Sequence, residues 1–206
     1  STGVILVNAG TFNATGPRVD VKRIAVAEEG HATTSAATVL QSGDFLKSGA
    51  GTLVVAGSSN ATSLIVEQGS LILEGASARF RAGATVTVEP VASSAAPSVT
   101  GPAPAANASA PTLVLVNANA NVGAGSLATL NVNGGALLGQ GNSKIQAANY
   151  HFGGGDLGNE IKLELGAGVM TVTGRTSVYA PLGADQINVS GAVLTLGQGA
   201  TLNPLV

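Results

Sequence analysis

The sequence predicts an all-β chain that winds into a parallel β-solenoid, a coil whose short strands turn corners and stack from one turn to the next. Strand-like runs of about four to six residues recur along the chain. The links between them are short, and Gly is abundant, with 29 residues in 206. Sandwich and barrel strands instead recur roughly every 8 to 12 residues and are often joined by hairpin turns.

The expected strands are apolar or alternate apolar and polar residues. The link 68–70 (Gln-Gly-Ser) between two of them is too short for most connections but suits the corner of a coil, where Gly supplies positive φ. Aromatic residues make up only 3%, as a narrow interior filled with aliphatic layers requires. The clearest runs are 52–56, 63–68, 70–74 and 84–89, and then 112–117, 128–133, 160–165, 169–173, 186–190 and 192–196.

Composition excludes several classes of protein. Charged residues are 10% of the chain against roughly a quarter in a typical domain. The mean hydropathy of +0.37 argues against disorder. The net charge of -2, without a Lys/Arg cluster, gives no basis for binding nucleic acid. The absence of Cys excludes disulfides and thiolate metal sites, and no apolar run reaches the roughly 18 residues of a membrane span.

We divide the chain into four segments. Residues 1–45 are expected to form N-terminal rungs or a cap, 46–89 solenoid rungs, and 112–206 further rungs. Residues 90–111 hold five of the eight prolines and no charge, which is typical of a linker or an inserted loop. The stretch 28–40 is the one candidate helix. The chain begins at Ser1 without Met, which favours an upstream segment or signal peptide that has been removed.

Residues 46–75 read LKSGAGTLVVAGSSNATSLIVEQGSLILEG. They resemble the passenger-associated β-strand repeat of autotransporters and of filamentous-haemagglutinin-like β-helix exoproteins. The first half of that repeat matches Leu46, Lys47, Gly49, Gly51, Thr52 and Leu53, and the second half matches Val66, Gly69, Ser70 and Leu71. Two departures are the missing spacer before Lys47 and Ser70 in place of Thr. Residues 184–202 look like a rung found near the ends of such passengers. The resemblance implies a right-handed β-helix on a secreted or cell-surface protein.

No residue pattern points to catalysis. His31 and His151 are the only histidines, and neither has the spacing of a metal site or a catalytic triad. We interpret His151 as a surface residue in a Gly-rich loop. Residues 153–158 (GGGDLG) hold one imperfect copy of a calcium nonapeptide, where tandem copies are needed. The acidic residues are dispersed, and no carboxylate pair can be named among Asp20, Asp44, Asp156, Asp185, Glu67, Glu74 and the adjacent Glu28 and Glu29.

Four Asn-x-Ser/Thr sequences begin at Asn13, Asn60, Asn107 and Asn188, and we interpret them as turn and ladder residues rather than glycan acceptors. We therefore expect no enzyme activity and no catalytic, cofactor or metal site.

The expected function is that of the fold itself. We expect a structural or adhesive solenoid, secreted or on the outer surface of a Gram-negative-type bacterium. Residues 201–206 stay apolar and show no polar cap, so we expect that the ends either continue into further sequence or join other subunits head to tail into a fibre. A host or surface glycan or protein receptor is a second expected partner. The alternative is a carbohydrate-binding or polysaccharide-cleaving β-helix, for which Tyr150, Phe152 and Tyr179 are the candidate aromatic platform.

Overall fold

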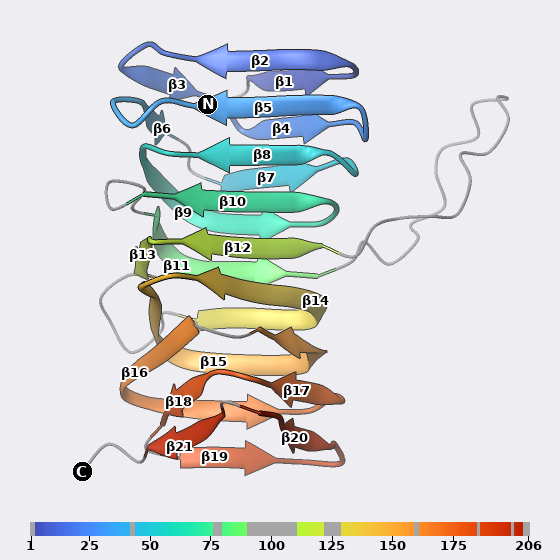
Figure 1. Cartoon of the computed structure of the whole chain (residues 1–206), viewed down its shortest axis with the longest axis vertical. Coiled ribbons are helices and arrows are strands. Elements are labelled where there is room, and N and C mark those ends of the chain that lie inside the picture. The colour runs from blue at the N-terminus through green and yellow to red at the C-terminus, as the bar shows by residue number, and fades with distance from the viewer. Residues whose placement is uncertain are drawn as a thin grey trace, which may run out of the picture.

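The computed structural model describes residues 3–41, 44–75, 80–89, 111–121, 129–158, 161–184, 186–198 and 200–203. All regular secondary structure in these ranges is β-strand, and the paired strands all run parallel. Figure 1 shows them stacked in one column from the N-terminal to the C-terminal end. The expected all-β parallel solenoid is therefore confirmed.

The column has three faces, which we number by the strand that opens each. The first face holds β1 (Val4–Val7), β4 (Arg23–Val26), β7 (Asp44–Ser48) and β19 (Gln186–Val189). The second holds β2 (Gly10–Ala14), β5 (Gly30–Thr34), β8 (Thr52–Val55), β10 (Ser70–Glu74), β12 (Thr112–Val116), β17 (Thr176–Val178) and β20 (Leu194–Leu196). The third holds β3 (Arg18–Asp20), β6 (Val39–Gln41), β13 (Asn119–Asn121), β18 (Pro181–Gly183) and β21 (Thr201–Asn203).

Five longer strands bend around corners and contribute to more than one face. β9 (Ser58–Val66), β11 (Phe80–Val88) and β16 (Ile161–Val172) run from the third face to the first. β14 (Thr129–Gln140) runs from the first to the second, and β15 (Ser143–Leu157) crosses all three. Descending the column in Figure 1, strands of the first face run rightward at the back and those of the second run leftward at the front, so the coil is right-handed.

Each strand pairs with the strand one rung later, where a rung is one circuit of the three faces. Val4 lies opposite Arg23, Gly10 opposite Gly30, and Arg18 opposite Val39, so one rung here takes 19 to 21 residues (23 − 4, 30 − 10 and 39 − 18). Because the two faces of a strand alternate, such a register keeps inward residues above inward residues.

The core is a set of columns of like residues. In β10, Leu71 and Leu73 are buried and Ser70, Ile72 and Glu74 lie outside. Leu71 stacks in register between Leu53 and Leu113, and Leu113 lies above Leu137. These aliphatic columns form one continuous hydrophobic cluster, which stabilises the coil through burial of apolar surface.

The expected helix at 28–40 is wrong. The segment holds β5 and β6, and β5 shows the strict alternation of a strand, with Gly30, Ala32 and Thr34 inside. Edges of β2 and β8 lie on both sides of β5 and supply backbone partners, and its Thr residues favour a strand. Of the expected insertion at 90–111, all but Pro111 lies outside the described residues.

Both ends of the column are open edges in the part of the chain that the structure describes. At one end β1, β2 and β3 pair only with β4, β5 and β6. At the other, β19, β20 and β21 pair only with β16, β17 and β18. No described helix is long and apolar enough to span a membrane.

Candidate functional site

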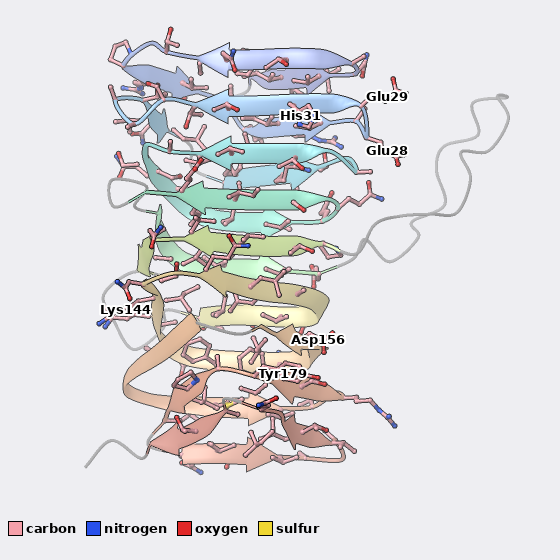
Figure 2. The ribbon with its side chains drawn as sticks, viewed as in Figure 1. Glu28, Glu29, His31, Lys144, Asp156 and Tyr179 are labelled. Atoms are coloured by element: carbon pink, nitrogen blue, oxygen red, sulfur yellow. The ribbon has the colours of Figure 1, made fainter. Side chains whose placement is uncertain are left out.

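The two histidines are far apart on the column and each lies on the outer surface of a strand. His31 is exposed on β5, and Figure 2 shows it near Glu28 and Glu29 at an upper rung. His151 is half-buried in β15, so its expected position in a Gly-rich loop is wrong. Its Nε2 lies 3.1 Å from Thr173 Oγ1.

His151 belongs to a column of outward polar side chains on the first face. Thr87, Asn131, His151, Thr171 and Asn188 follow one another in register. Asn131 Nδ2 donates to Thr87 Oγ1 at 3.3 Å. Asn131 and Thr87 thus hydrogen-bond along the column, as stacked polar residues on a sheet commonly do. His151 contacts the Thr173 hydroxyl, but among the described residues no third side chain hydrogen-bonds to His151 to orient it as a general base.

The described aspartates lie on three different faces. Asp20 on the third face pairs with Arg18, with 2.7 Å between Arg18 Nη2 and Asp20 Oδ2. Asp44 on the first face accepts a 2.7 Å hydrogen bond from Ser63 Oγ. Asp156 is exposed on the second face, at the end of β15. A general acid and base must lie on the two sides of one scissile bond, and these three aspartates are not brought together in that way.

Asp156 comes from the GGGDLG stretch that resembled a calcium loop. In the structure most of that stretch continues β15, and Gly155, Asp156 and Leu157 pair with β17. Among the residues that the structure describes, no group of three or more His, Asp or Glu side chains could hold a metal ion.

The expected aromatic platform does not exist as one surface. Tyr150 and Phe152 are buried inside the coil, with ring centroids 5.8 Å apart, and Tyr150 Oη donates to the Ile145 carbonyl at 2.9 Å. Only Tyr179 is exposed, at a corner beside Gly197. Strand parity explains the error: Tyr150 and Phe152 share the inward side of β15, and His151 between them faces out.

The most unusual polar group lies inside the coil. Lys47 on β7 is 0% exposed, and it occupies the column between Ile24 on β4 and Val66 on β9. Its Nζ donates to three backbone carbonyls: Ser48 at 3.0 Å, Gly49 at 2.7 Å and Gln68 at 2.9 Å. Burial lowers the pKa of Lys47 from 10.5 to about 8, so the amine is still mostly protonated at pH 7.

Sequence reasoning missed this role of Lys47 and treated the residue only as part of a repeat. The available signal was parity, because Lys47 stands two positions after the apolar Phe45 and therefore on the same side of the strand.

In comparisons with known proteins, no family model, no curated protein and no solved structure matches the chain.

Proposed function

We propose that the chain serves as a non-catalytic structural or adhesive β-solenoid, a stiff rod on a secreted or cell-surface bacterial protein. The observation that supports this best is the continuous parallel stacking of three faces from β1 to β21 around one aliphatic core. Bending such a column would break backbone hydrogen bonds on at least one face, so the fold resists bending. Such a rod, with its repeated polar exterior, can hold other parts of a protein at a distance or present binding groups to a partner.

The polar outer surface of the column and the resemblance in residues 46–75 support the proposed location outside the cell and the proposed family. The resemblance to autotransporter-type and filamentous-haemagglutinin-like repeats rests on Lys47, Gly49, Gly51, Gly69 and their neighbours. Such proteins act outside the cell, and we extend that location to this chain. A glycan or protein receptor on another surface is the partner that an adhesive role would require.

We further propose that the two open ends pair with each other in successive copies of the chain. Three strand edges at each end have backbone groups available for a further parallel rung. Apolar side chains that point toward the core are exposed on the end rungs: Val189 at 48% and Leu196 at 44% at one end, with half-buried Ile5 at the other. A head-to-tail contact of this kind does not close on itself and yields a fibre.

Blocking each end separately tests the assembly. Ile5 and Ile187 point toward the core from the two end rungs, opposite Ile24 and Met170. Lys at either position meets solvent in a single rod but would be buried in a stacked one, which is costly. We expect the unmodified chain to form rods whose length rises with concentration in electron micrographs. Ile5→Lys alone and Ile187→Lys alone should stop at monomers.

The decisive measurement is the size of the assemblies formed when the two blocked variants are mixed. Each retains one open end, so an equimolar mixture should form dimers and nothing longer. Leu6→Lys and Asn188→Lys are matched controls, because these neighbours lie on the outer side of the same strands and should assemble normally. Monomers at every concentration of the unmodified chain would refute the assembly.

The non-catalytic and adhesive parts need a separate experiment. A glycan array together with assays of reducing-sugar release on common polysaccharides distinguishes binding from cleavage. The proposal expects no release of reducing ends. Turnover of any polysaccharide by the purified chain would overturn the non-catalytic role and favour the polysaccharide-cleaving alternative.

A further inference from the structure

Lys47 is the exception to the uncharged composition of the described core. Of the described residues that are buried and polar, it alone is charged; the others are Thr and Ser hydroxyls. The side chain comes from an inward position between Ile24 and Val66, so its alkyl part continues an aliphatic column. Its ammonium group lies, still buried, at the corner between the first and second faces.

The partners of that ammonium group belong to two successive rungs. Ser48 ends β7 and Gly49 lies in the corner that follows it, and Gln68 lies in the corner that follows β9 one rung later. An ammonium group has three N–H donors, and here each has one carbonyl acceptor. Among the described residues, no backbone N–H donates to the carbonyl of Gly49 or Gln68, so Lys47 supplies their hydrogen bonds.

No carboxylate neutralises this cation. The charged residues of the adjoining strands and corners are Arg23, Glu28, Glu29, Asp44 and Glu67, and all of them are at least partly exposed to solvent. Arg23 Nε donates to Ser48 Oγ at 2.9 Å, and Asp44 accepts from Ser63. The ion pair found among the described residues joins Arg18 and Asp20 on another face. The site is therefore built from carbonyl dipoles alone.

Two glycines bring the carbonyls together. Gly49 and Gly69 have φ of +78° and +64°, which only glycine adopts readily. A Cβ at Gly69 would lie 2.6 Å from the Gly49 oxygen and would also strike the Gly51 oxygen. The two corners thus stack so closely that their carbonyls converge on one point.

We propose that the carbonyl oxygens of Ser48, Gly49 and Gln68 form a binding site for a protonated amine, which the native chain fills with its own Lys47 and which fixes one corner in register over the next. A slip of two residues keeps apolar side chains inward, so the aliphatic columns alone oppose it weakly. A cation held by oxygens from both corners opposes it, since such a slip would move Gln68 out of its reach.

The site predicts that a small amine will replace a deleted side chain. Lys47→Ala removes three methylene groups and the ammonium, which together correspond to n-propylammonium. We expect this variant to melt at a lower temperature than the native chain, and the melting temperature to rise with added n-propylammonium chloride, logarithmically once its concentration exceeds the dissociation constant. 1-Propanol has the same number of heavy atoms but a single O–H donor for the three carbonyls, and sodium chloride controls for ionic strength; neither should restore stability at equal concentration.

Val66→Ala is the matched variant. It opens a cavity in the same column, directly below Lys47, and leaves the carbonyl site filled. We expect no specific response of Val66→Ala to n-propylammonium. If 1-propanol restores Lys47→Ala as well as the amine does, or if Val66→Ala responds equally, the position is a cavity for apolar groups and the proposal fails.

A second variant covers the case in which Lys47→Ala does not fold. The chain has no Cys, so Lys47→Cys carries a unique thiol. Alkylation of the unfolded variant with an aminoethyl group produces a lysine isostere, and alkylation with a hydroxyethyl group produces a neutral partner of the same length. After refolding, the aminoethyl form should melt near the native temperature and clearly above the hydroxyethyl form. Equal melting of the two forms would overturn the proposal.

Discussion

Single glycines at the corners determine how closely neighbouring rungs can stack. Gly69 and Gly75 stand at the two ends of β10, and both have positive φ, +64° and +82°. They differ in their surroundings: a Cβ at Gly69 would strike the backbone of the corner above, whereas nothing lies within 4 Å of one at Gly75. The pair therefore separates the conformational role of glycine from its role in packing.

We predict that Gly75→Ala lowers the free energy of unfolding by about 1 kcal/mol, the cost of a left-handed conformation for a residue with a Cβ. Gly69→Ala should cost about 3 kcal/mol or more, because overpacking against backbone adds to that strain. Denaturant unfolding of both variants beside the native chain measures the difference. Equal losses would mean that the corners can move apart without penalty.

Lys47 gives the stability a defined dependence on pH. Its pKa is about 8 in the folded chain against 10.5 in the absence of burial. Between these values the unfolded chain holds a proton that the folded chain has released, so stability rises with pH in this window. The cost of desolvating the charge is present below pH 8 and disappears as the amine deprotonates, even though the carbonyls still determine where the group lies.

We therefore predict that the native chain gains stability relative to Lys47→Met by about 3 kcal/mol from roughly pH 7 to pH 11. Chemical unfolding of both proteins across this range provides the measurement, and the comparison removes the titration of all other groups. A difference that stays constant or falls with pH would show that burial does not lower the pKa of Lys47.

At the scale of one strand, alternation assigns opposite roles to neighbouring residues. Leu71 and Ile72 are adjacent in β10 and similar in size, but Leu71 is buried in the aliphatic core and Ile72 lies on the outer side. Leu71 also has Leu53 and Leu113 in register above and below it, so its loss affects three rungs.

We predict that Leu71→Ala costs about 2 to 5 kcal/mol and leaves a cavity, whereas Ile72→Ala costs about 1 kcal/mol or less. Thermal or denaturant unfolding distinguishes the two. Similar losses for the two variants would mean that β10 has the opposite orientation or that Ile72 is covered in solution.

The same alternation explains how much of the fold could be predicted. Runs such as 70–74 and 112–117 alternate clearly or are apolar, and the structure has strands there. The segment 28–40 was misassigned as a helix because its Ala and Thr residues carry little pattern and its strand character depends on the neighbours β2 and β8. Long strands such as β14 were expected only in part, because their bends at corners depend on stacking rather than on local sequence.

The candidate site shows a different limit. The separation of the aspartates could be predicted from their spacing, and Asp20, Asp44 and Asp156 lie on three faces. The convergence of carbonyls around Lys47 could not, because Gln68 approaches only after one complete rung. Backbone groups carry no residue-specific signal in a sequence, so a site built from them appears only in three dimensions.

At the scale of the whole molecule, the column behaves as a stack of near-equivalent layers in which each rung contacts mainly its two neighbours. Stability in such an architecture is close to a sum over rungs and the interfaces between them. One layer should then be removable if the layers above and below it can meet in register. Residues 149–168 are such a layer, because Asn149 and Val169 occupy equivalent positions, 20 residues apart (169 − 149).

We predict that deletion of residues 149–168 yields a folded, shorter rod. Leu130 would then pack on Met170 and Val132 on Val172, which are pairs of buried apolar residues that already flank the same columns. Circular dichroism and cooperative unfolding establish the fold, and small-angle scattering gives the length.

Deletion of residues 150–168 is the control, one residue shorter. It places Val169 where the inward Tyr150 stood and turns the apolar side of the following strand toward solvent, so this variant should unfold at a markedly lower temperature. If both deletions are tolerated equally, the rungs are not held by the register of their columns. If both abolish folding, the column is one indivisible core, and rung-by-rung stacking does not describe its energetics.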